Sequence, residues 1–172
     1  MAQALGRCPI KAISMESLQE LVDKLKAHNA SWVLDVKDAL GETTITAPRE
    51  AIYDICQFLK DENGFDMLAD LCGADRGPEE HPRFEVNYHL FSTIHHKRLR
   101  LKVTLSEDDV HVETVTTVWR TAEWHERETY DLVGVIFDGH PDLRRILLPS
   151  DFDGHALRKD YPLRGYEPYS MN

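Results

Sequence analysis

The sequence predicts an α+β domain in which a mainly antiparallel sheet is covered on one face by amphipathic helices and is followed by an extended C-terminal tail. Two runs in the middle of the chain alternate strictly between apolar and polar residues, two earlier segments repeat apolar residues at helical spacing, and no sustained period continues past residue 138. Period-2 alternation is typical of strands with one buried face, and 3.6-residue spacing is typical of helices. We therefore divide the chain into a globular domain, residues 1–138, and a tail, residues 139–172.

The first half of the chain predicts two helices and a strand pair. A helix is expected from Ser14 to about Asn29 with Ser14 or Ser17 as its cap, because Leu18, Leu21, Val22 and Leu25 fall at helical spacing. A second helix is expected from Pro48 to Gly64, with Ile52, Ile55, Cys56 and Leu59 on its apolar side. Between them, "SWVLDV" and "ETTIT" flank Gly41 and predict two short strands around a turn.

The clearest signal is a hairpin of two alternating strands. It is preceded by "FDMLADL", which is expected to start a further strand, and by the loop "GADRGPEEHP". The strands "RFEVNYHLF" and "RLRLKVTL" are joined through "STIHHK". The residues expected to face the core are Phe84, Val86, Tyr88 and Leu90 on the first strand and Leu99, Leu101, Val103 and Leu105 on the second.

After a short "VHV", a helix is expected from Trp119 to Val133, and the tail follows with prolines and turn residues. Within the tail "RRILLP" could form a strand, and "DGHPDLRR" and "DGHALRKD" echo each other. Two alternatives exist for the tail: it is disordered, or it is laid along a partner. Disordered tails are poor in aromatic residues, whereas this one holds Phe152, Tyr161, Tyr166 and Tyr169, so its composition favours the partner.

Composition excludes several classes of function. The chain has 172 residues, 42% of them hydrophobic and 29% charged, and a formal net charge of −10. This charge argues against a nucleic-acid-binding surface and against attraction to an anionic membrane. The longest apolar run, "LVGVIF", is too short to span a bilayer, and no secretory signal is expected. Cys8, Cys56 and Cys72 form no CxxC pair and are interpreted as reduced thiols, so we expect a cytoplasmic or equivalent compartment.

One stretch, "WHERETYDLVG", comes close to the zinc-protease pattern HExxH. The second histidine ligand is missing, because Thr129 stands at that position after His125 and Glu126. The chain also has no GxGxxG, Walker A or GxSxG motif. We therefore expect no catalytic residue, no cofactor site and no metal site in this chain.

The charges of the same stretch predict an ion network. Glu123, Arg127 and Asp131 are four residues apart, so that the guanidinium can lie between two carboxylates on one helix face. Glu126 falls on the apolar side of the helix, where a carboxylate is costly unless it is paired. Two interpretations stay open at this point: a surface charge network with Glu126 at its edge, or a partly buried ion network that orients the helix.

The segment "ERETYDLVGVIFDGHPDLRRIL", Glu126 to Leu147, closely resembles the signature of the hydrophilic C subunit of NADH:quinone oxidoreductase, respiratory complex I. The tail sequence "LPSDFDGHALRKDYPLRGY" and the hairpin are also similar to that family, which covers roughly Phe65 to Tyr166. Val133 departs from the pattern, since many members are expected to carry an aromatic residue there.

The resemblance implies a cofactor-free, non-catalytic subunit of the peripheral arm, on the cytoplasmic or matrix side and associated with the membrane only through the complex. The host complex uses NADH, FMN, iron–sulfur clusters and quinone on other chains, and the tail is expected to wrap the quinone-site catalytic subunit. The residues expected to contact partners or support assembly are Glu126, Arg127, Glu128, Asp131, His140, Arg144, Arg145, His155, Arg158, Lys159, Tyr161, Pro162 and Arg164.

Two other functions are kept as alternatives. One is the equivalent subunit of a related membrane-bound hydrogenase, which the neighbouring genes would distinguish. The other is a stand-alone metal-dependent enzyme that uses the histidine and glutamate residues, and metal analysis of the purified chain would decide it.

Overall fold

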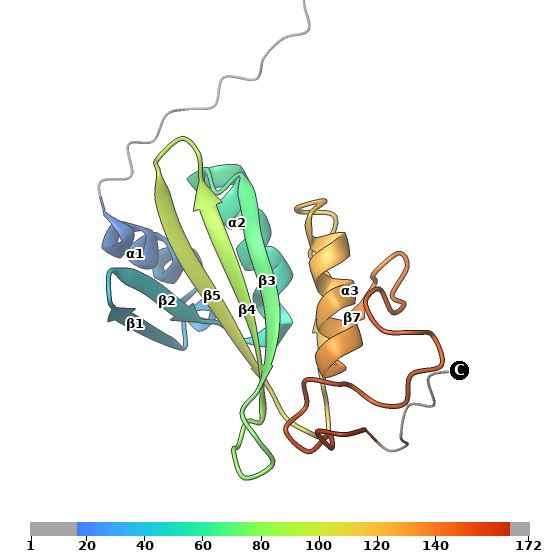
Figure 1. The fold of residues 1–172 in the computed structure, drawn as a ribbon. Coiled ribbons are helices and arrows are strands. Elements are labelled where there is room, and N and C mark those ends of the chain that lie inside the picture. Colours follow the sequence, from blue (N-terminus) through green and yellow to red (C-terminus); the bar gives the residue numbers. More distant parts are fainter. Residues whose placement is uncertain (1–16, 166–172) are drawn as a thin grey trace, which may run out of the picture.

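A computed structural model describes residues 17–165. Its centre is a five-stranded sheet of order β1-β2-β5-β4-β3 (Figure 1). All neighbouring strands are antiparallel except β2 and β5, which are parallel. The strands are β1 (Asp35–Ala39), β2 (Glu42–Thr46), β3 (Met67–Asp75), β4 (Phe84–Ser92) and β5 (Lys97–Leu105). The predicted α+β class with a mainly antiparallel sheet is confirmed.

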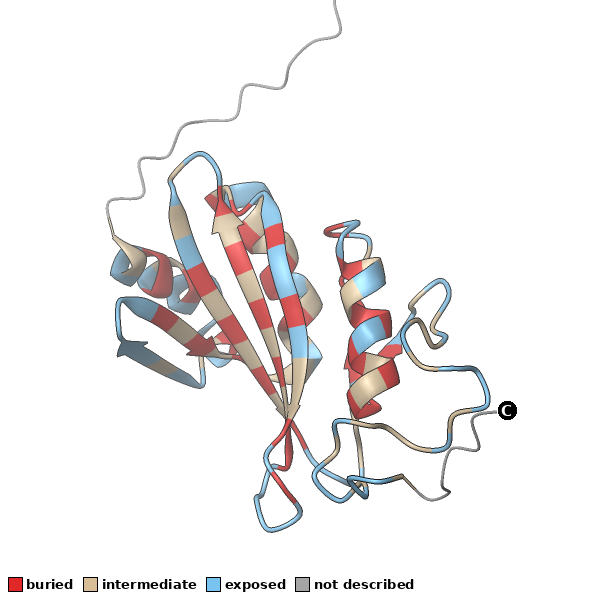
Figure 2. Ribbon diagram, in the orientation of Figure 1, coloured by how far each residue is buried: buried red, intermediate tan, exposed pale blue. Residues whose placement is uncertain are grey.

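The alternation in the sequence sets which face of the sheet is buried. On β4 and β5 the apolar residues are buried and their neighbours are partly exposed, which Figure 2 shows as alternating colours along both strands. The register places Tyr88 opposite Leu101 and Val86 opposite Val103, so the apolar side chains of the hairpin share one face. The opposite face carries the polar residues.

Helices α1 (Leu18–His28) and α2 (Ile52–Asn63) cover the apolar face. Helix α1 is capped by Ser17, whose side-chain oxygen accepts a hydrogen bond from the N–H of Glu20, so Ser17 is the cap of the two that were predicted. Helix α2 follows a 3₁₀ turn, Arg49–Ala51, and ends at Gly64 in the left-handed conformation with φ 71°. The buried residues of both helices join the inward residues of the strands in one core.

Helix α3 (Ala122–Val133) packs beside β3 (Figure 1). Gly73 of β3 allows this approach, because a Cβ atom there would lie 2.6 Å from Thr129 Cγ2. The strands β6 (His111–Glu113) and β7 (Ile136–Asp138) form a second small parallel sheet, and β7 contacts α3. Residues 139–165 then run along α3 without forming a helix or strand.

Several predicted boundaries were wrong. Most of "SWVLDV" lies outside β1, because Ala30–Trp32 forms a 3₁₀ turn. Strand β3 continues to Asp75, into the segment that was predicted to be a loop. The sequence "RRILLP" forms no strand, because its N–H groups bind a side chain of α3 instead of another strand. Ser14, Cys8, Tyr166 and Tyr169 lie outside the described residues.

Candidate docking site on helix α3 and the C-terminal segment

The centre of the site is the carboxylate of Asp131, which is fully buried near the end of α3. Its Oδ2 atom accepts hydrogen bonds from three consecutive N–H groups, those of Ile146 (3.0 Å), Leu147 (2.8 Å) and Leu148 (2.8 Å). Its Oδ1 atom lies 2.8 Å from Nη1 of Arg145. Burial alone would raise the pKa of Asp131, but these donors outweigh it and hold that pKa below its usual range. Asp131 therefore remains a carboxylate and fixes residues 145–148.

The last turn of α3 is completed by residues 139–165, which we call the C-terminal segment. A helix leaves its last carbonyl groups without intrahelical partners. Here the carbonyl of Asp131 accepts from Nδ1 of His155 (2.9 Å), that of Leu132 from the N–H of Leu157 (2.9 Å), and that of Val133 from Nε of Arg158 (2.7 Å). Positive side chains at this end also suit the helix dipole. The C-terminal segment is thus the cap of α3.

The echo between the two "DGH" sequences is structural. In each copy the glycine adopts a left-handed conformation, with φ 83° at both Gly139 and Gly154. The histidine that follows donates to a backbone carbonyl of α3: His140 Nε2 to Glu123 (3.1 Å) and His155 Nδ1 to Asp131 (2.9 Å). The two copies bind the two ends of one helix.

The end of the C-terminal segment is fastened to the main sheet. Asp75 and Arg83 form an ion pair of 2.8 Å in which both side chains are buried. The N–H of Lys159 donates to Asp75 (2.8 Å), and the carboxylate of Asp160 lies 3.0 Å from Arg83. The hydrogen bonds from Arg83 hold the pKa of Asp75 well below its usual range. The sequence analysis missed this pair, although an aspartate and an arginine stand at the two ends of the β3–β4 connection.

The predicted position of Arg127 between two carboxylates was wrong. Its guanidinium donates to the carbonyls of Arg144 (3.2 Å) and Arg145 (3.3 Å) and lies over the ring of Trp124. Asp131 is instead neutralised by Arg145. The charged partner of the Asp131 carboxylate thus lies in the C-terminal segment, which also donates three backbone N–H groups to that carboxylate.

Glu126 fits neither of the two open interpretations. Its side chain is fully buried, and it accepts hydrogen bonds from the Thr114 hydroxyl (2.5 Å) and the Val115 N–H (2.8 Å), both of which are neutral. Burial raises the pKa of Glu126 to about 7. Glu126 therefore ties α3 to the chain before it through hydrogen bonds and belongs to no ion network.

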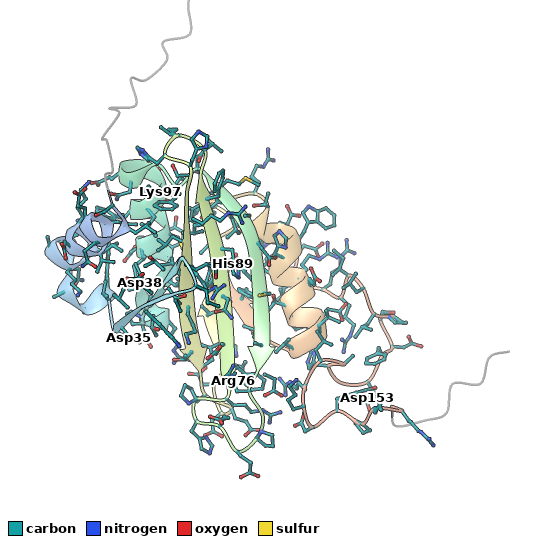
Figure 3. The ribbon with its side chains drawn as sticks, turned by 60° about the vertical axis from the view of Figure 1, so that its left-hand side comes forward. Asp35, Asp38, Arg76, His89, Lys97 and Asp153 are labelled. Atoms are coloured by element: carbon teal, nitrogen blue, oxygen red, sulfur yellow. The ribbon has the colours of Figure 1, made fainter. Side chains whose placement is uncertain are left out.

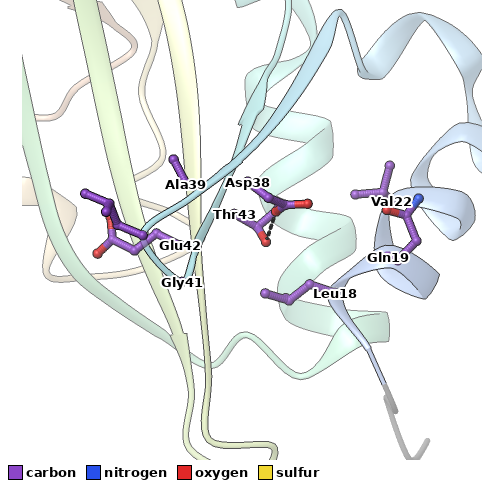
Figure 4. A pocket seen from close by; sticks show the side chains of 9 residues that line it. Leu18, Gln19, Val22, Asp38, Ala39, Gly41, Glu42 and Thr43 are labelled. Atoms are coloured by element: carbon purple, nitrogen blue, oxygen red, sulfur yellow. Dashed lines mark hydrogen bonds between the residues drawn. The ribbon is translucent and has the colours of Figure 1, made fainter.

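The zinc-protease pattern is not assembled. Glu126 points into the core, while His125 lies at the surface with its Nδ1 atom 3.6 Å from Asp70. In the hollow between α1 and the β1–β2 turn, the side chains of Asp38 and Thr43 are hydrogen-bonded to each other (Figure 4).

The other predicted contact residues lie on the surface of the same region. Glu128, Lys159, Pro162 and Arg164 are exposed, Arg144 is exposed and pairs with Asp142 (2.9 Å), and the ring of Tyr161 stacks on Phe152. Large apolar side chains are exposed among them, with relative exposures of 58% for Trp124, 60% for Leu147, 56% for Leu157 and 103% for Leu163. We call these four residues the apolar patch. The sequence analysis based its preference for a partner on the aromatic residues of the tail and did not single out these residues.

No helix among residues 17–165 is both long and apolar enough to cross a membrane. Several polar groups of the C-terminal segment bind α3, and its outer side carries both charged and large apolar side chains. The fold and the site together define a small α+β protein that carries a pre-shaped surface segment on its last helix.

Comparison with known proteins gives the family. Residues 45–167 match the family described as respiratory-chain NADH dehydrogenase, 30 Kd subunit. The C subunit of the NADH-quinone oxidoreductase of Geobacter sulfurreducens is 48% identical over 150 residues, which cover 86% of this chain and 93% of the relative. The corresponding protein of Geobacter metallireducens is 46% identical over 157 residues, which cover 90% of this chain and 97% of the relative.

Solved structures agree. A trypsin-resistant fragment of Nqo5 has 32% sequence identity and a TM-score of 0.64, covering 73% of this chain and 98% of that chain. A chain of the archaeal membrane-bound sulfane sulfur reductase has 22% identity and a TM-score of 0.70, covering 86% of this chain and 87% of that chain, which shows a shared fold. The chain therefore belongs to the 30 kDa, or C, subunit family of NADH:quinone oxidoreductase, respiratory complex I, as its signature indicated.

Proposed function

We propose that this chain is a non-catalytic assembly subunit of the peripheral arm, and that α3 and the C-terminal segment dock onto the quinone-site catalytic subunit. One observation carries the proposal: the C-terminal segment directs its hydrogen-bonding groups toward α3 and exposes the apolar patch. Large apolar side chains that a fold leaves exposed to solvent are common at protein interfaces.

The internal hydrogen bonds also explain how docking becomes favourable. An extended segment without a helix or strand would lose much conformational entropy on binding if it were free. Here Asp131, the two histidines and Arg158 already hold it in one shape. Less ordering is needed at the moment of association, which improves affinity.

The proposed role in the complex follows from family membership. NADH, FMN, iron–sulfur clusters and quinone would be bound by other chains, on the cytoplasmic or matrix side of the membrane, and this chain would position the quinone-site subunit. We propose no step of electron transfer through its residues.

The test uses a tagged chain expressed in its own host. The double variant Leu157→Ser/Leu163→Ser is expected to lower the amount of assembled complex several-fold, since each lost leucine contact is worth about 2 kcal/mol when fully buried. Leu40→Ser is the matched control, because Leu40 is as exposed as Leu163, at 105% and 103%, but lies in the β1–β2 turn. Wild-type assembly in the double variant would contradict the docking surface.

The non-catalytic role has a separate test. His125→Ala and Glu128→Gln remove polar groups from the surface of α3. We expect the turnover of NADH with quinone, measured per assembled complex, to stay unchanged in both variants. A fall in turnover at normal assembly would show a catalytic contribution from this chain.

A further inference from the structure

A second group of chemically active side chains lies away from the apolar patch, on strands β3 and β4. Asp70 pairs with His89 across the two antiparallel strands, and Cys72 is two residues beyond Asp70 on β3. Residues two apart on a strand point to the same face. All three side chains therefore lie on the polar face of the sheet, where Figure 3 shows His89. An irregularity in the strand pairing between Leu68 and Asp70 shifts the register beside them.

The spacing of these side chains suits a metal ion. One carboxylate oxygen, the Cys72 sulfur and one ring nitrogen of His89 all lie within 4.8 Å of one another. Ligand bonds of about 2.0 to 2.3 Å in a tetrahedral zinc site separate the ligand atoms by roughly 3.3 to 3.8 Å. The limit of 4.8 Å is wider than this separation, so the three side chains must draw together to bind one ion. A mixed set of sulfur, nitrogen and oxygen ligands is typical of borderline transition metals such as Zn²⁺ or Co²⁺.

The three side chains are also available. Neither the Cys72 thiol nor the His89 imidazole has a hydrogen bond to another residue in the described part of the chain, and Cys72 is exposed. A metal ion binds the neutral imidazole ring of a histidine. An entering ion competes with one internal contact, the approach of His125 Nδ1 to the Asp70 carboxylate at 3.6 Å.

Helix α3 adds groups at the edge of the site. The Nδ1 atom of His125 lies 3.6 Å from the Asp70 carboxylate, so it is the nearest imidazole for a fourth position. Asp70 and Glu128 both act electrostatically on Cys72 and attract a cation, as does Glu42 near His89, while Arg100 and Arg98 oppose it. Apart from the ligand Asp70, two acidic groups and two arginines act on the site.

We propose that Asp70, Cys72 and His89 form a binding site for one divalent transition-metal ion. The site goes beyond the docking function and lies on the polar face of the sheet, with His125 and Glu128 of α3 at its edge. A thiol releases its proton when it binds a metal ion, so binding is expected to strengthen as pH rises.

Cobalt is the probe for the test, because a thiolate bound to tetrahedral Co²⁺ gives a charge-transfer absorption band. The full chain, purified in the reduced apo form, is titrated with Co²⁺ and followed by calorimetry and absorption. We expect one Co²⁺ per chain with the thiolate band, loss of the band in Cys72→Ser, and affinity at least about tenfold lower in His89→Ala. Circular dichroism of each variant checks that the fold is kept.

Two matched controls make the result specific. Cys8→Ser removes a different thiol, and His96→Ala removes a histidine in the β4–β5 turn. Both should keep the band and the affinity of the unmodified chain. The proposal is overturned if no thiolate band forms, if the band survives in Cys72→Ser, or if Cys8→Ser abolishes it.

Discussion

Asp131 and Arg145 form an ion pair of 2.8 Å in which the carboxylate is fully buried and the guanidinium is 18% exposed. The same guanidinium donates to the carbonyls of Phe152 (3.0 Å) and Gly154 (2.8 Å). One side chain thus connects the end of α3 to two turns of the C-terminal segment. The pair shapes the surface that we propose for docking.

Asp131→Asn tests the contribution of this pair to stability. The amide leaves Arg145 without its counter-charge and weakens three backbone hydrogen bonds, so we expect a loss of about 3 kcal/mol in the free energy of unfolding. Urea unfolding of the isolated chain measures it, with an unchanged m-value. Asp142→Asn breaks the exposed pair with Arg144 and should cost less than about 1 kcal/mol. Equal losses in the two variants would contradict the role of Asp131.

Glu126→Gln tests the effect of pH. The pKa of Glu126 is about 7 in the folded chain against an ordinary value of 4.5. The folded state therefore binds the proton more tightly, and stability is expected to fall as pH rises from about 4.5 to 7 and then to level off. Glutamine stays neutral at both pH values. Between pH 4.5 and pH 8, the difference in free energy of unfolding between the variant and the unmodified chain should therefore shift in favour of the variant by on the order of 1 to 3 kcal/mol.

The measurement for Glu126 is a pair of urea unfolding curves at pH 4.5 and pH 8 for each protein. Glu128→Gln is the control, because Glu128 is an exposed neighbour on the same helix. It should follow the pH profile of the unmodified chain. Parallel profiles for the unmodified chain and Glu126→Gln would show that Glu126 ionises without penalty.

Gly134→Ala tests how closely the C-terminal segment approaches the end of α3. Gly134 has φ 85°, and an added Cβ would lie 2.6 Å from both Arg158 Nη2 and His155 Cδ2. Gly41→Ala separates backbone strain from collision, since Gly41 has φ 81° and nothing within 4 Å of the added atom. Strain alone costs about 1 kcal/mol at either site. We expect Gly134→Ala to lose more stability and to become more sensitive to protease after Pro149, whereas Gly41→Ala should resist cleavage there.

Truncation after Pro149 tests which part of the C-terminal segment is needed for folding and which part is needed for docking. The truncated chain keeps the bonds of Asp131 to residues 145–148 but loses those that residues 155–158 make to the last carbonyls of α3. We expect a folded domain of lower stability that no longer joins the complex. Circular dichroism measures the fold, and co-purification from the host measures assembly. Normal incorporation of the truncated chain would show that docking uses other surfaces.

The main elements of the fold could be predicted because their signals are local. Alternation on β4 and β5 and helical spacing in α1 and α2 depend on which side chains face the core, and burial follows them residue by residue. The short strand β7 and the parallel pairing of β2 with β5 gave no such signal. Both depend on contacts between segments far apart in the chain, which periodicity does not encode.

The site was predicted in part. Family resemblance selected Asp131, Arg145, His155 and Arg158, and the structure brings them together at the end of α3, while their contact with a partner remains a prediction. Helical spacing suggested the wrong partner for Arg127, because i to i+4 pairing considers only one helix. The guanidinium of Arg127 instead donates to two backbone carbonyls of the C-terminal segment.

The cap of α3 has a consequence for biosynthesis. The groups that bind the last carbonyls of the helix, and those that neutralise Asp131, all come from residues 145–158, which the ribosome makes after the helix itself. Until they emerge, the end of α3 must remain hydrated, whereas α1, α2 and the five strands precede it in the chain. The docking surface can therefore be completed only after residues 145–158 have been translated, later than all the strands of the main sheet.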